Sequence, residues 1–159
     1  MNKEEAKRIA RQKMDENGLQ DWKINIETAY SRAGVCFHYE KEIRLSEQYI
    51  ARMPEIEVLD TILHEIAHAI LPTGHGHDEV WKATCIKIGC RPQRCIPEEF
   101  KIEKKWVAIC PTCGTRFGRQ KRVKRSDIRW CRKCHRKYPN DLTKSRLIFQ
   151  PNIEYQREA

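Results

Sequence analysis

The chain has 159 residues, 33% of them charged and 40% hydrophobic, and its formal net charge at pH 7 is +9. This length allows one ordinary domain, or a small domain with an appendage. No run of about 18 apolar residues appears, which argues against a membrane-spanning helix. The charged N-terminus lacks the apolar stretch of a secretory signal, so we expect a reducing, cytoplasmic or nucleoid-associated location. The eight cysteines are then metal ligands or buried thiols rather than disulfides.

The charge is distributed unevenly along the chain. Residues 1–100 contain 14 Lys and Arg against 17 Asp and Glu, whereas residues 101–159 contain 17 against 5. Such asymmetry indicates a polyanionic partner for the second part.

The first predicted elements are one helix and three short strands. Apolar residues at helical spacing predict a helix over residues 3–16. Alternating apolar residues then predict strands near 22–26, 35–39 and 42–45. Together these strands predict a small, mostly antiparallel sheet.

A second group of elements follows the sheet. Residues 55–71 are apolar around much of the helical circumference, which predicts a largely buried central helix. A shorter helix is predicted over 78–88, ended by Gly89. We therefore expect an α+β fold in which the sheet packs on the central helix. The expected domains are a first domain at 1–97, a basic module at 98–138 and a tail at 139–159.

The central helix carries the motif His64-Glu65-Ile66-Ala67-His68. Positions i and i+4 share one helical face, so His64 and His68 can hold one metal ion together. Glu65 then lies beside the open side of the metal, where it can take a proton from water. Burying such polar groups without partners costs roughly 2–7 kcal/mol each, and a metal ion removes that cost. The motif predicts a catalytic zinc site with Glu65 as the general base.

A catalytic zinc takes three protein ligands, so a third ligand is needed. The metzincin spacing fails because Leu71 and Gly74 occupy its positions. We prefer His77, which follows the flexible turn Gly74-His75-Gly76, and His75 and Glu79 are the alternatives. Three carboxylates are candidates either to orient the imidazoles or to cap a helix: Asp60, Asp78 and Glu79.

These residues resemble the SprT-like (Spartan-type) family of zinc metallopeptidases. Its pattern is H-E-x-x-H, a loop and then H-G-x-x-[FW]; here His77 and Trp81 match, while Asp78 replaces the glycine. The likeness extends over about residues 5–138 and is similar to forms found in bacteria and their phages; a phage-encoded form would act in the host cytoplasm. It implies a minimal zincin-like fold and an endopeptidase acting on proteins bound or crosslinked to DNA. It also implies that Glu42 to Leu45 is an edge strand that can pair with an extended peptide.

The basic module contains two C-x2-C pairs. Cys110 and Cys113 are separated from Cys131 and Cys134 by 17 residues, which is typical of a structural four-cysteine zinc ribbon. We therefore expect two zinc ions per chain, one catalytic and one structural. The other cysteines are interpreted as buried thiols, with a further metal site through Cys90 and Cys95 as the alternative: Cys36, Cys85, Cys90 and Cys95.

Eleven of the 22 residues at 116–137 are Lys or Arg, interleaved with aromatic residues. This favours sequence-independent binding of DNA through phosphate contacts and base stacking, although a solvated surface is the simpler interpretation of many charge runs. The residues expected to contact DNA are Arg116, Arg119, Lys121, Arg122, Lys124, Arg125, Arg129 and Trp130.

Two other functions remain open at this point. The main alternative is a non-catalytic, DNA-associated adaptor in which the zinc ion of the H-E-x-x-H motif only stabilises the fold. The intact Glu65 argues against this alternative. A metal hydrolase acting on a non-peptide substrate is the third.

Overall fold

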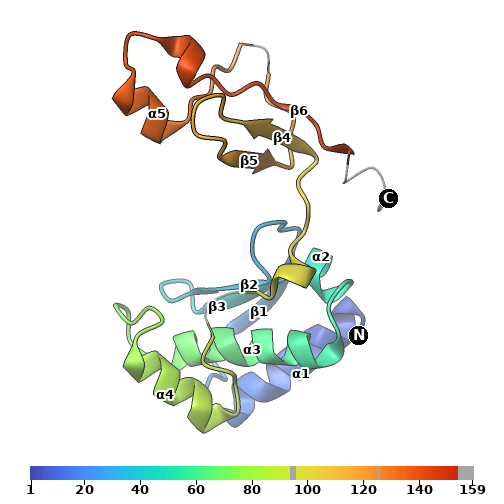
Figure 1. Cartoon of the computed structure of the whole chain (residues 1–159). Helices are drawn as coiled ribbons and strands as arrows, with labels where there is room; N and C mark the ends of the chain where they lie inside the picture. The colour runs from blue at the N-terminus through green and yellow to red at the C-terminus, as the bar shows by residue number, and fades with distance from the viewer. Residues whose placement is uncertain (94–95, 125, 154–159) are drawn as a thin grey trace. The chain divides into compact units, whose positions relative to one another are not determined.

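The computed structural model describes residues 1–93, 96–124 and 126–153 (Figure 1). The chain forms two compact units, Met1–Ile102 and Glu103–Ala159. Helices, small sheets and a cysteine cluster are all present, so the expected α+β class is confirmed. The first unit extends beyond the expected boundary at residue 97, because Phe100 and Ile102 pack against its hydrophobic core.

The sheet of the first unit is mixed rather than mostly antiparallel. Its strands are β1 (Lys23–Glu27), β2 (Gly34–Phe37) and β3 (Glu42–Ser46), in the order β1-β3-β2. β3 pairs antiparallel with β2 and parallel with β1. The chain reverses once in residues 28–33 and again in the β2–β3 hairpin, so β1 and β3 run in the same direction.

The expectation that Glu42 to Leu45 form an edge strand is wrong. These residues lie in β3, which has a neighbour on both sides, and the edges of the sheet are β1 and β2. Ile43 and Leu45 are fully buried on one face of this strand, while Arg44 on the opposite face remains partly exposed. The edge strand that packs against the long helix is β2.

Four helices complete the first unit: α1 (Lys3–Glu16), α2 (Glu47–Ile50), α3 (Glu55–Ile70) and α4 (Glu79–Ile88). α3 contacts α1, α4, β2 and β3, so it lies at the centre of this unit. Its apolar side chains Ile62 and Ile66 are fully buried together with Trp81 of α4. No helix in the described part of the chain is long and apolar enough to cross a membrane.

The ends of α4 are set by local sequence. The Asp78 side chain caps the first turn by accepting a hydrogen bond from the backbone N–H of Trp81 at 2.9 Å. At the other end Gly89 adopts a left-handed conformation with φ +82, which a side chain would strain. The backbone N–H of Cys90 then donates to the carbonyl of Cys85 at 2.8 Å, and the chain turns back towards α3.

The second unit is built on a three-stranded antiparallel sheet. β4 (Trp106–Ile109) lies between β5 (Arg116–Arg119) and β6 (Gln150–Pro151), and the helix α5 (Arg132–Lys137) follows β5. β6 falls in the segment expected to be a tail, and it pairs with β4. The core is small and consists largely of cysteines, with Ala108 and Leu147 beside them.

Candidate metal centres

Three histidines of the first unit converge on one point. His64 and His68 come from α3, and His77 comes from the loop that precedes α4. His77 Nε2 lies 3.1 Å from His64 Nε2 and 3.3 Å from His68 Nε2. A tetrahedral ion with zinc–nitrogen bonds of about 2.0–2.1 Å holds its nitrogen ligands about 3.3 Å apart. The donor set and its spacing therefore fit a zinc ion.

The two alternatives for the third ligand lie elsewhere. His75 Nδ1 is 2.8 Å from Asp78 Oδ2, and Glu79 pairs with Lys82 on the surface of α4. Neither residue belongs to the histidine cluster, whereas His77 does. The loop after α3 thus brings His77 to the position that the sequence favoured.

The protonation of the cluster suits metal binding. Burial lowers the pKa of His64 to about 4; the neighbouring His77 lowers it further, while a hydrogen bond with the backbone of Gln93 opposes this. Burial likewise lowers the pKa of His68 to about 4, with His64 and His77 adding to the effect. A neutral imidazole can offer a ring-nitrogen lone pair to a cation, and a cation between the converging nitrogens would remove the repulsion between such lone pairs.

The Trp81 ring packs against all three imidazoles of the histidine cluster. Its ring is fully buried, and its centroid lies 4.7 Å from that of His64, 5.2 Å from His68 and 4.5 Å from His77. One rigid side chain therefore contacts all three imidazoles and restricts their orientations.

Glu65 is buried beside the cluster, with only 7% of its surface exposed. Burial raises the pKa of its carboxyl group to about 8, and the positive charge of Arg32 opposes this rise. A divalent cation held by the histidines would also favour the carboxylate form. Glu65 is packed against β2 at Gly34, where a Cβ atom would lie 2.7 Å from Glu65 Cγ and 2.9 Å from Oε1.

His38 is a site residue that the sequence did not reveal. Its Nε2–H donates to the backbone carbonyls of His68 at 2.9 Å and Leu71 at 3.2 Å. These carbonyls are at the end of α3, where a helix leaves acceptors unpaired. The available signal was the alternation of Gly34, Cys36 and His38, which places them on one face of the chain at β2.

The nearby carboxylates have structural partners. Asp60 accepts hydrogen bonds from the backbone N–H of Arg91 at 2.9 Å and from its guanidinium at 3.1 Å. Asp78 caps α4, as described above. Asp60 ties the segment after α4 to α3, and the same segment supplies the Gln93 backbone that bonds the His64 ring.

A model of the SprT-like family matches residues 4–106 of the chain. The chain belongs to the SprT-like family. The match spans the first unit, including the histidine cluster and Glu65, and membership indicates a function of the metallopeptidase type. No curated protein matched the chain.

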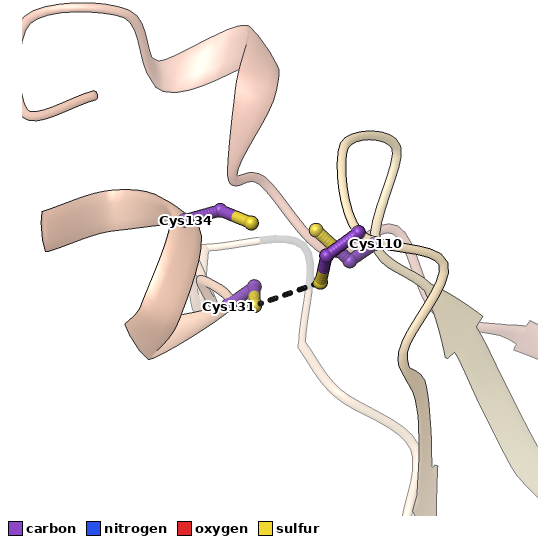
Figure 2. Close-up of side chains that lie close together, drawn as sticks. Cys110, Cys131 and Cys134 are labelled. Carbon is purple, nitrogen blue, oxygen red and sulfur yellow. Dashed lines mark hydrogen bonds between the residues drawn. The ribbon is translucent and has the colours of Figure 1, made fainter. Parts of the chain in front are cut away.

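The second unit of this SprT-like protein contains the other group that could hold a metal ion. The sulfur atoms of Cys110, Cys113, Cys131 and Cys134 all lie within 4.8 Å of one another. Figure 2 shows the labelled side chains of this group turned towards a common centre. Cys113 Sγ is 3.6 Å from Cys131 Sγ, and zinc–sulfur bonds of about 2.3 Å in a tetrahedron hold sulfurs about 3.8 Å apart. The four thiols fit a closed, structural zinc site.

The backbone around the first pair of cysteines forms a tight turn. Gly114 has φ +69 and donates its N–H to the carbonyl of Cys110, while the Cys110 N–H donates to the carbonyl of Thr115, both at 3.0 Å. The Thr115 hydroxyl lies 3.2 Å from Cys113 Sγ and lowers the pKa of that thiol to about 6. This favours the thiolate form that zinc binds.

The remaining cysteines of the SprT-like chain lie apart from the four-cysteine cluster. Cys85 and Cys90 are buried, and burial raises the pKa of both thiols. Cys36 is half-buried on β2, and burial raises the pKa of its thiol to about 12. Cys95, the proposed partner of Cys90 in a further metal site, lies outside the described residues.

The basic side chains expected to contact DNA are exposed where the structure describes them, and Arg125 lies outside the described residues. Arg119 lies over the ring of Phe149 and Arg122 over that of Trp106, with centroid distances of 5.9 and 5.4 Å. Trp130 is stacked on His135 at 5.3 Å. The other members of the set are exposed on β5 or in the segments that flank it: Arg116, Lys121, Lys124 and Arg129.

Proposed function

We propose that this protein is a zinc-dependent endopeptidase. His64, His68 and His77 would hold the catalytic zinc, and Glu65 would act as the general base. The observation that supports this most strongly is the convergence of three imidazole nitrogens next to a buried carboxylate. A purely structural zinc site has no need of such a carboxylate.

The chemistry follows from the positions of these groups. Zinc bound by the histidines supplies Lewis acidity towards a substrate carbonyl and lowers the pKa of water. Glu65 would accept the proton that the attacking water loses and later deliver it to the leaving amine. The buried position of Glu65 suits this role, because burial raises the pKa of its carboxyl group towards the working pH.

The edge strand β2 supports a peptide as the substrate. The Ser46 N–H donates to the Ala33 carbonyl at 2.7 Å, so the alternating ladder directs residues 33, 35 and 37 towards β3. The backbone groups of Gly34 and Cys36 therefore point to the open edge. An extended peptide pairing with them would lie beside Glu65, which contacts Gly34.

We further propose that the second unit binds DNA and brings the protease to DNA-bound or DNA-crosslinked proteins. Exposed Arg and Lys side chains with neighbouring aromatic rings support phosphate contacts and base stacking. A binding mode of this kind does not depend on base sequence.

The experiment that tests the proposal uses a DNA-binding protein as the substrate. Wild type and Glu65→Gln are incubated with it, with and without DNA and with and without a chelator. We expect wild type to cleave, most efficiently with DNA, and expect no cleavage by Glu65→Gln or after chelation. Glu79→Gln is the matched control, because Glu79 is an exposed carboxylate outside the cluster, and it should cleave like wild type.

Two outcomes would contradict the proposal. Cleavage by Glu65→Gln at the wild-type rate would exclude Glu65 as the base. A zinc-loaded wild type that leaves a broad set of DNA-bound proteins intact would favour the adaptor function instead.

A further inference from the structure

The second unit has an open groove of about 960 Å³ beside β4. Three isoleucines line it and remain largely exposed: Ile109 at 65%, Ile148 at 67% and Ile153 at 68%. Single exposed aliphatic residues are common, but three around one groove form an apolar patch of the kind that marks interaction sites. The zinc-binding cysteines do not line this groove.

Part of a sheet edge is open at this groove. β5 pairs with all of β4, whereas β6 pairs only with Trp106 and Val107. The Asn152 N–H donates to the carbonyl of Lys105 at 2.9 Å, so the alternating ladder directs residues 105, 107 and 109 towards β6. In the described part of the chain, no backbone hydrogen bond of Ile109 continues this ladder. The backbone groups of Ile109 can therefore pair with an added strand.

Two charged residues line the groove in the described part of the chain, and both are arginines. They are Arg116 and Arg146, and no Asp or Glu accompanies them in the described part of the lining. Arg116 is 3.5 Å from the carboxylate of Glu103, while Arg146 has no ion pair within the ranges that the structure describes. A ligand with a carboxylate near Arg146 would complement this charge.

The residues that line the groove also favour a peptide over a nucleic acid as its ligand. Among the residues that the structure describes, no aromatic side chain lines the groove, so unpaired bases would find no stacking surface in that part of it. Aliphatic walls, an open strand edge and two guanidinium groups suit an extended polypeptide instead.

We propose that this groove binds an extended segment of a partner protein in which aliphatic and acidic residues alternate. The segment would pair with the backbone of Ile109, place aliphatic side chains against Ile148 and Ile153, and set a carboxylate next to Arg146. All residues used in this proposal belong to the second unit, so peptide binding at the groove does not depend on the proposed protease activity.

A peptide titration followed by NMR tests this inference. The probe is a short peptide that alternates leucine with glutamate, added to the ¹⁵N-labelled full chain carrying Glu65→Gln, so that the probe would not be cut. We expect shifts in the amide signals of Val107, Ile109 and Ile148. Ile148→Asp and Arg146→Glu should each weaken binding by about tenfold or more.

Matched controls lie outside the groove. Ile128 is also an exposed isoleucine of the second unit, at 51%, and Lys133 is an exposed cation. Ile128→Asp and Lys133→Glu should bind the peptide like the parent chain. A peptide with lysine in place of glutamate should bind at least about tenfold more weakly than the acidic one.

Several results would overturn the inference. One is the absence of shifts at the groove amides at millimolar peptide, and another is equal binding by groove and control variants. A DNA oligonucleotide that shifts these amides when the peptide does not would assign the groove to nucleic acid. Self-association in sedimentation that is lost in Ile148→Asp would assign it to a second copy of the chain.

Discussion

Gly34 and Glu65 approach so closely that a Cβ atom at position 34 would lie 2.7 Å from Glu65 Cγ. A methyl group at this position must displace either the carboxylate or the edge strand β2. We therefore expect Gly34→Ala to reduce the rate of peptide cleavage by about tenfold or more while the zinc content stays unchanged, since a tenfold loss corresponds to a barrier only about 1.4 kcal/mol higher. Peptidase assays and elemental analysis of the same preparation check both parts.

Gly76→Ala is the control for this substitution. Nothing lies within 4 Å of a Cβ atom at position 76, so the added methyl group meets open space. This variant should retain wild-type activity. Full activity of Gly34→Ala would show that Glu65 does not depend on the close packing against β2.

The histidine cluster predicts which histidine substitution lowers the zinc content of the protein. His77→Ala should retain one zinc ion per chain, the one in the cysteine cluster, because it removes one of three converging nitrogens. His75→Ala should retain both ions, since His75 bonds Asp78 outside the cluster. Elemental analysis of the purified variants distinguishes the two histidines. Loss of zinc from His75→Ala with full retention by His77→Ala would reverse the assignment.

The elements of the first unit were largely predictable because their signals are local. The cap Asp78 and the terminator Gly89 are short-range features, and α4 lies within a residue of its predicted range. α3 also ends within a residue of its predicted range, because its apolar pattern and the motif at His64 and His68 are local features of one helix. The position of His77 followed from its spacing and its fit to a known pattern.

Strand neighbours were not predictable in the same way. Apolar alternation shows which face of a strand is buried, but it does not identify the strand beside it. The expectation that β3 lies at an edge came from the family resemblance instead, and β3 is central. The role of His38 depends on the ends of two elements meeting in space, and β6 is too short to show any alternation.

Glu42 provides a prediction on stability and pH. Hydrogen bonds from Arg44 at 2.6 Å and Asn25 at 2.6 Å hold the pKa of this carboxyl group at about 2, below its usual 4.5. The folded-state pKa is lowered, so its contribution to stability is present above pH 4.5 and is lost as the pH falls towards 2. Glu42→Gln should destabilise the protein by about 1 kcal/mol at pH 7 and by less at pH 3.

Urea denaturation at the two pH values measures this difference. Glu40→Gln serves as the control because Glu40 is exposed in the hairpin turn, and it should change stability little at either pH. A stability difference for Glu42→Gln that is equal at pH 7 and pH 3 would contradict the assigned role of the carboxylate.

The proposed DNA contacts predict a change in salt dependence. Lys121 and Lys124 are exposed near β5, so replacing both with glutamine should lower the slope of log affinity against log salt by about 0.9 for each phosphate that is no longer neutralised. The same replacement of Lys3 and Lys87 in the first unit changes the net charge equally and should leave the slope unchanged. Fluorescence anisotropy with a labelled oligonucleotide at several salt concentrations tests this. Equal effects of the two double variants would indicate a general charge effect.

The second unit is expected to depend on its zinc ion for folding. Apart from its cysteines, the buried core of this unit contains only Ala108 and Leu147 among the described residues, which is too little apolar surface to offset the entropy of an ordered chain. Cys134→Ser should therefore retain one zinc ion, lose the dispersed NMR signals of β4 and β5, and keep those of α3. Cys36→Ser, which changes a cysteine outside the cluster, should retain both zinc ions and all of these signals. A Cys134→Ser variant with an intact second unit would show that the sheet folds without its metal.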